Sequence, residues 1–203
     1  MRDVPAIRPE SVIGAKLYAD RCHMLKNLGI PRGARIAEIG VAHGEFSDFL
    51  IRELAPSQFY ALDTFDMEKI PVIWGTPQEV LFQGKTHYNF YCDRFASLKD
   101  RMTVMRGPSA ETAPALPNAS LDMIYLDAQH LYDAIAQDAA VSARKIKRDG
   151  VLVFNDYVLY DPFIQTEYGV VPVVNEMLDS GEWRVLGFAL QRHMFCDIAI
   201  KRI

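Results

Sequence analysis

The chain has 203 residues, half of them apolar, and a formal net charge of −4. This length favours a single domain over residues 1–203, and the acidic balance argues against a nucleic-acid-binding protein, which usually carries a basic surface stripe. No apolar run approaches the roughly 18 residues of a membrane span, and the first ten residues lack the pattern of a secretory signal. We therefore expect a cytoplasmic protein that binds small molecules and has no membrane or nucleic-acid partner.

The first 33 residues are predicted to form an N-terminal helical segment. Ser11 is placed to cap a helix whose apolar residues recur at helical spacing, and Gly29 followed by Pro31 would end it. Residues 35–39 then show the pattern of a short buried strand, which leads into a glycine-containing loop and an amphipathic helix. The sequence thus predicts a strand, a turn and a helix in succession.

Further strands and helices alternate along the rest of the chain. Strands are predicted at residues 59–62, 103–105, 123–126, 151–154, 183–189 and 194–200, and helices at 131–146 and 170–178. Such alternation indicates parallel strands joined by right-handed crossovers, and the last two strands are close enough in sequence to form a hairpin. We predict an α/β, Rossmann-like, doubly wound, mostly parallel seven-stranded sheet with an antiparallel C-terminal hairpin.

Residues 64–102 form an insertion that is longer than a minimal strand-to-strand connection and is rich in aromatic residues. Connections of this length are usually functional lids or binding loops that contain helices of their own. We interpret the insertion as a substrate lid or as a contact in a homo-oligomer. A packed structural insertion is equally compatible with the pattern.

The segment from Glu38 to Gly44 contains two glycines that would let the backbone turn tightly and approach a ligand. Asp63 ends the next strand, where its carboxylate can accept both hydroxyl hydrogens of a ribose. A dinucleotide site would favour a second glycine at the position of Ala42, and Glu38 would repel a pyrophosphate. Because an acid there balances the amino group and sulfonium of S-adenosylmethionine, the motif predicts this cofactor.

A second polar group follows two later strands. Asp127 and the pair Asn155-Asp156 supply two carboxylates and an amide oxygen at strand ends that should converge. Hard oxygen ligands of this kind suit Mg²⁺, which would lower the pKa of a bound hydroxyl and orient it. The alternative is that these residues merely cap strand ends and helix starts.

Four segments carry a resemblance to a known family: residues 37–47, 61–65, 124–132 and 153–157. The chain resembles class I S-adenosylmethionine-dependent methyltransferases, specifically the family of macrocin-type sugar O-methyltransferases and, more distantly, the catechol O-methyltransferases. The resemblance implies that Ser109 lies near the adenine and that Asp127, Asn155 and Asp156 bind a divalent ion. The residues expected to bind the cofactor are Glu38, Gly40, Gly44, Asp63, Ser109 and Asp127.

The chain departs from the macrocin-type pattern at one position. Members usually carry Asp-Gly-Asp-His where this chain has Asp127-Ala128-Gln129-His130. Gln129 cannot take a proton at neutral pH, so either another group takes it or no base is needed once a metal has acidified the hydroxyl. His130, whose imidazole titrates near working pH, is the candidate base. Asp127 and His130 are therefore the predicted catalytic residues. A hydrogen bond from His130 to the cofactor or to a backbone carbonyl is an equally compatible role.

Together these observations predict an S-adenosylmethionine-dependent O-methyltransferase that acts, with Mg²⁺, on a hydroxyl of a small molecule. The expected acceptor is a sugar or phenolic part of a secondary metabolite. One alternative is a metal-independent N- or O-methyltransferase, in which Gln129 marks a lost metal site. Another is a catalytically silent nucleoside-binding module, because a fold does not guarantee activity.

Overall fold

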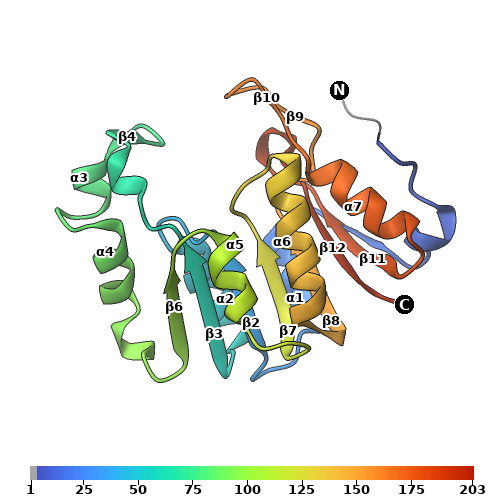
Figure 1. Cartoon of the computed structure of the whole chain (residues 1–203), viewed down its shortest axis with the longest axis horizontal. Coiled ribbons are helices and arrows are strands. Elements are labelled where there is room, and N and C mark those ends of the chain that lie inside the picture. Colours follow the sequence, from blue (N-terminus) through green and yellow to red (C-terminus); the bar gives the residue numbers. More distant parts are fainter. Residues whose placement is uncertain (1–3) are drawn as a thin grey trace.

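Eight strands form the main sheet of the computed structural model, which describes residues 4–203; residues 1–3 of the predicted N-terminal segment lie outside the described range. Figure 1 shows the sheet with helices on both faces. The strands, in sheet order, are β1 (Lys16–Tyr18), β11 (Trp183–Ala189), β12 (Asp197–Arg202), β8 (Ile146–Phe154), β7 (Leu121–Leu126), β2 (Arg35–Ile39), β3 (Gln58–Asp63) and β6 (Met102–Arg106).

The five strands from β8 to β6 are parallel, whereas β12 pairs antiparallel with both β8 and β11. This confirms the predicted Rossmann-like sheet with its C-terminal hairpin. The structure adds an eighth strand, because β1 pairs parallel with β11 at the sheet edge. The chain order reverses between β2 and β7, and ligands of such sheets bind beyond the carboxyl ends of the strands at this point.

The N-terminal segment differs from the predicted helix starting at Ser11. It contains a 3-10 turn, η1 (Pro9–Val12), then β1, and then a short helix, α1 (Arg21–Asn27). Asp20 caps α1 by accepting a hydrogen bond from the His23 N–H. Ile13 and Leu17, which suggested the helical spacing, are 71% and 70% exposed. The prediction was wrong because these two apolar residues do not belong to a buried helix face.

Helices cover both faces of the sheet, each with its own apolar core. One face carries α5 (Ser109–Thr112), α6 (Tyr132–Lys145) and α7 (Val170–Asp179), and the other carries α1, α2 (Glu45–Leu54) and α4 (His87–Arg94). β2 contributes Ile39 to the first core and Ile36 to the second, as the alternation of side chains along a strand requires.

Two predicted boundaries moved. Ile146, predicted as the last helical residue, has extended backbone and begins β8, so that this strand is longer than residues 151–154. The last strand begins at Asp197 rather than at residue 194, because Arg192–Met194 form a 3-10 turn, η5. Outside the insertion, the remaining elements are the hairpin β9 (Tyr160–Asp161) and β10 (Thr166–Glu167), and the turn η4 (Ala113–Ala115). Over residues 4–203, no helix is long and apolar enough to cross a membrane.

The insertion at residues 64–102 lies beyond β6, at the left end of the sheet in Figure 1. Besides α4 it contains η2 (Met67–Lys69), β4 (Val72–Ile73), β5 (Thr76–Pro77), α3 (Gln78–Leu81) and η3 (Ala96–Leu98). The Phe65, Phe82 and Tyr91 side chains are fully buried, while Trp74 is 72% exposed. Much of the insertion is thus packed into the fold, and its role as a substrate lid remains a prediction.

Candidate active site

A cavity of about 470 Å³ opens beyond the carboxyl ends of β2, β3, β6 and β7. Its size falls in the usual range of cofactor and small-molecule pockets. Four residues that the sequence predicted for the cofactor lie on its wall: Gly40, Asp63, Ser109 and Asp127. The other lining residues are Ile39, Ala42, Leu62, Thr64, Met67, Gly107, Pro108, Ala128 and Gln129.

The two glycines of the loop are required by close packing inside the protein. Gly40 has φ +89°, and a Cβ there would lie 2.2 Å from the Asp127 carbonyl oxygen, so any other residue would push the ends of β2 and β7 apart. Gly44 has φ +81° at the start of α2, where a Cβ would lie 3.0 Å from the rings of Tyr91 and Phe95. Gly44 does not line the cavity.

Asp63 holds the loop in place from the end of β3. Its Oδ2 accepts hydrogen bonds from the backbone N–H groups of Val41 (2.9 Å) and Ala42 (3.2 Å). Its Oδ1 accepts one from the Phe65 N–H at 2.7 Å. The Thr64 hydroxyl lies 3.4 Å from the same Oδ1, but its single proton serves the shorter bond to Asp66 Oδ1 at 2.7 Å. A carboxylate can accept about four hydrogen bonds, so Asp63 retains capacity for one ribose hydroxyl at the cavity wall.

Glu38 lies beneath the loop and does not line the cavity. The carboxylate is 1% exposed and accepts a hydrogen bond from the Ser47 hydroxyl, which in turn accepts one from the Tyr91 hydroxyl at 2.9 Å. Burial raises the pKa of Glu38 well above its usual value, and the Ser47 hydrogen bond opposes this shift. Glu38 therefore ties the loop to α2 and, through Tyr91, to α4 of the insertion.

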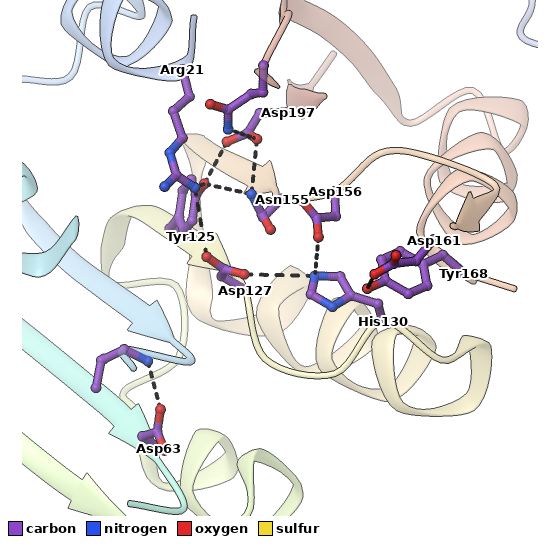
Figure 2. A network of polar contacts seen from close by, with 12 residues as sticks. Arg21, Asp63, Tyr125, Asp127, His130, Asn155, Asp156, Asp161, Tyr168 and Asp197 are labelled. Atoms are coloured by element: carbon purple, nitrogen blue, oxygen red, sulfur yellow. Dashed lines mark hydrogen bonds and ion pairs between the residues drawn. The ribbon is translucent and has the colours of Figure 1, made fainter. Parts of the chain in front are cut away.

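A cluster of polar side chains surrounds His130 at the ends of β7 and β8 (Figure 2). The His130 Nε2 lies 3.8 Å from Asp127 Oδ1 and 3.8 Å from Asp156 Oδ2. This nitrogen is buried and has no hydrogen-bond partner within residues 4–203. The imidazole stacks on the Tyr168 ring, with centroids 4.8 Å apart, and the Tyr168 hydroxyl donates to Asp161 at 2.8 Å. The ring is thus fixed with one unpaired nitrogen facing two carboxylates.

The electrostatics of the cluster favour uncharged forms. Burial raises the pKa of Asp127 well above its usual value, a shift opposed by Arg21 and strengthened by Asp156. Burial also raises the pKa of Asp156, to about 7, and lowers the pKa of His130. A neutral His130 carries a lone pair that can accept a proton. A nearby cation would stabilise the ionised forms of Asp127 and Asp156.

Sequence reasoning missed Arg21 and Asp197, which support this cluster from α1 and β12. Arg21 Nη1 donates to the Tyr125 hydroxyl at 3.0 Å and lies 3.9 Å from Asp127 Oδ2. The Tyr125 hydroxyl donates to Asp197 Oδ2 at 2.6 Å. An acid at the start of the apolar run from residue 197 to 200 was the available signal for Asp197, whereas no pattern near Arg21 pointed to the site.

Asn155 is held by the same network. Its Nδ2 donates to Asp197 Oδ1 at 3.1 Å and to the Tyr125 hydroxyl at 3.3 Å. In Figure 2 its amide oxygen points toward the space between Asp127 and Asp156. Within residues 4–203, no three His, Cys, Asp or Glu side chains are grouped closely enough to hold a metal by themselves. A metal here would need the Asn155 oxygen and water or acceptor oxygens as further ligands.

Comparison with known proteins agrees with this geometry. The model of the methyltransferase domain family matches residues 37–157, more than half of the chain. Among solved structures, the M1A22 tRNA methyltransferase TrmK of B. subtilis has a TM-score of 0.57 and 14% identity over 91% of this chain and 66% of its own. This chain therefore spans just under two thirds of that protein's length. No curated protein matches the chain in sequence.

Two further structures are similar over nearly their whole length. The S-adenosylmethionine-dependent methyltransferase of Mesorhizobium loti has a TM-score of 0.59 and 14% identity, over 89% of this chain and 95% of its own. That of Aquifex aeolicus has a TM-score of 0.57 and 15% identity, over 89% and 88%. These likenesses show the fold, and the family match spans the loop at Gly40, Asp63 and both acidic strand ends. The chain therefore belongs to the methyltransferase domain family, and it has the fold of the class I S-adenosylmethionine-dependent methyltransferases.

Proposed function

We propose that this methyltransferase acts on a hydroxyl oxygen of a small molecule, a sugar or phenolic part of a secondary metabolite, and that Mg²⁺ assists it. The observation that carries the proposal is the buried, unpaired His130 Nε2 that faces Asp127 and Asp156 beside the cofactor cavity. Asp127 lines this cavity as well, so it links the methyl donor to the acidic cluster. The macrocin-type resemblance of the sequence supports the same acceptor class.

In this reaction the chain's own residues hold the acceptor and move one proton. The acceptor oxygen forms a bond to the methyl carbon as the carbon–sulfur bond of S-adenosylmethionine breaks, and S-adenosylhomocysteine leaves. His130 Nε2 takes the hydroxyl proton, for which its neutral form is suited. Alignment of oxygen, carbon and sulfur would supply much of the rate.

The donor set at the acidic cluster fits a hard divalent cation. Two carboxylates of raised pKa, Asp127 and Asp156, and the amide oxygen of Asn155 are the ligands that Mg²⁺ prefers, with waters or acceptor oxygens completing its shell. A bound Mg²⁺ would lower the pKa of the acceptor hydroxyl. Macrocin-type and catechol-type enzymes thus offer the model for the reaction, and Gln129 leaves His130 as the base.

One observation favours a second candidate, metal-independent methyl transfer to oxygen or nitrogen. The Arg21 guanidinium lies 3.9 Å from Asp127 Oδ2 and already supplies positive charge to the cluster. If this charge suffices, the acids would orient the acceptor without a cation. The two candidates differ in whether chelation affects the rate.

The test is methyl transfer from labelled S-adenosylmethionine to a panel of sugar and phenolic hydroxyl acceptors, before and after chelation. The proposal predicts transfer to oxygen that is lost with EDTA and restored by Mg²⁺. An undiminished rate in the chelated enzyme would establish the metal-independent candidate. Transfer to nitrogen acceptors alone would contradict the proposed acceptor class.

A further inference from the structure

We propose that His87, a buried histidine of the insertion, is a positioning residue for the cofactor: it holds the carbonyl of Ala42 and so keeps this part of the cavity wall in its ligand-binding conformation. The inference rests on the cofactor cavity and is independent of the acceptor chemistry proposed above.

Ala42 adopts a backbone conformation that alanine rarely takes. Its φ is +44°, in the left-handed region, and it lines the cofactor cavity. For a residue with a Cβ, this region is disfavoured about fivefold to thirtyfold. A glycine at this position would adopt the conformation freely, so the surrounding structure must stabilise the alanine.

Hydrogen bonds from two sides fix the Ala42 backbone. Its N–H donates to Asp63 Oδ2 at 3.2 Å, and its carbonyl oxygen lies 2.6 Å from His87 Nε2. Since a carbonyl can only accept, Nε2 is the protonated nitrogen of this histidine. Asp63 and His87 therefore clamp one residue of the cavity wall between β3 and the insertion.

His87 is itself held rigidly. It is the first residue of α4 and is fully buried, and its backbone N–H donates to Glu68 Oε2 at 3.3 Å. Its ring packs between Phe65, with centroids 5.0 Å apart, and Phe82, with centroids 4.8 Å apart. The ring therefore cannot move away from Ala42 without disturbing the aromatic core of the insertion.

The unused nitrogen of His87 argues against a packing role alone. Nδ1 is buried and has no hydrogen-bond partner within residues 4–203. An unpaired buried polar atom is unfavourable, and an apolar side chain between Phe65 and Phe82 would avoid it. What the imidazole gains in return is the bond to the Ala42 carbonyl. A preformed wall raises ligand affinity because less ordering is left to occur on binding.

The test is calorimetric titration of S-adenosylhomocysteine into the wild-type protein and six variants. His87→Leu removes the donor and should weaken binding about fivefold to thirtyfold, the cost of the unsupported left-handed alanine. His87→Gln places an amide donor where Nε2 lies and should restore affinity to within about threefold, on the scale of a net hydrogen bond. His87→Asn is too short to reach the carbonyl and should behave like His87→Leu. Because asparagine is polar, this variant can also replace His87→Leu in the test if the leucine variant fails to fold.

The most decisive comparison uses a variant with glycine at position 42. In the Ala42→Gly background, His87→Leu should cost less than about threefold, because glycine adopts the left-handed conformation without support. His23→Leu, at an exposed histidine of α1, is the matched control and should leave binding unchanged.

Three results would overturn the inference. Unchanged affinity in both His87→Leu and His87→Asn would show that the clamp does not matter. Equal losses with alanine and with glycine at position 42 would show that His87 acts through packing alone. Wild-type protein that binds no S-adenosylhomocysteine would overturn both this inference and the cofactor site, whereas failed methyl transfer to hydroxyls with intact binding would contradict only the proposed function.

Discussion

The cofactor side and the acidic side of the active site are built differently. The cofactor side is formed by the ends of the parallel strands β2, β3, β6 and β7 and the residues that directly follow them. Asp63, at the end of β3, accepts hydrogen bonds from successive N–H groups of the loop after β2. The acidic side consists of side chains brought together from α1, β7, β8, β12 and the segment after β10 (Figure 2). The comparison teaches that the cofactor side follows from the strand ends of one parallel sheet, whereas the acidic side also needs α1, β12 and the segment after β10, which reach it from distant parts of the chain.

The largest expected effect separates chemistry from cofactor binding. Replacing His130 with alanine should lower methyl transfer by about 10²- to 10⁴-fold, the usual contribution of a general base. The affinity of the variant for S-adenosylhomocysteine should stay within about twofold of the wild-type value, because the substitution is not expected to remove a hydrogen bond to the cofactor. Rates and calorimetry on the same preparation check this, with His23→Ala as the control. If the His130 variant lost affinity for the cofactor but kept its rate, His130 would belong to the cofactor side and not to the side that carries the chemistry.

The next effect concerns the cation. Asp156→Asn removes one of the two carboxylates facing His130 Nε2, so the Mg²⁺ concentration for half-maximal rate should rise at least about 10- to 100-fold. Metal titration of the chelated enzyme measures this. Asp133→Asn, at an exposed acid in the first turn of α6, should leave the titration unchanged. An unaltered midpoint in the Asp156 variant would remove this residue from the proposed metal site.

A smaller effect probes the support of the acidic side. Tyr125→Phe deletes the buried hydroxyl that joins Arg21 to Asp197, so it should lower the free energy of unfolding by about 1–3 kcal/mol. Urea denaturation measures this. Tyr60→Phe removes a half-buried hydroxyl bonded to Arg35 and should cost less than about 1 kcal/mol. Equal costs in the two variants would show that the Arg21–Asp197 network contributes no special stability.

The last effect is a pH dependence on the cofactor side. Burial raises the pKa of Glu38 in the folded protein, so the folded state binds its proton more tightly than the unfolded state. Stability from this group is complete below the unfolded pKa of about 4.3 and falls as pH rises toward the folded pKa. Glu38→Gln should therefore gain stability relative to wild type between pH 4 and pH 8, by about 1.4 kcal/mol for each unit of pKa difference. Urea midpoints that keep the same difference at both pH values would contradict the buried carboxylate.

The sequence allowed the cofactor side to be predicted because its determinants are local. Gly40 and Asp63 sit at the ends of adjacent strands whose apolar patterns were clear, and the structure places both on the cavity wall. The structure gives a different reason for glycine at position 40 than the predicted approach to a ligand: the missing side chain makes room for the Asp127 backbone. Strand pairing sets that approach, and no single segment encodes it.

The acidic side could be predicted only in part. Asp127, His130, Asn155 and Asp156 follow strands and were predicted to converge, and the structure groups them (Figure 2). Arg21 and Asp197 join them through contacts across most of the chain, which no local pattern predicted. The misread N-terminal segment shows the same limit, because β1 exists through its pairing with β11 at the other end of the sequence. Likewise His87 could not be connected to Ala42 before the packing of the insertion was known.

The most direct test of the account is calorimetric titration of S-adenosylhomocysteine into wild-type protein and Asp63→Ala. Loss of a charged acceptor at the cavity wall should weaken binding by about 1.5–3 kcal/mol, roughly 10- to 150-fold. Asp66→Ala, at an acid of the insertion that bonds Thr64 and Lys69, is the matched control and should bind as wild type does. Equal affinity in the wild type and Asp63→Ala would contradict the placement of the cofactor between the loop and β3.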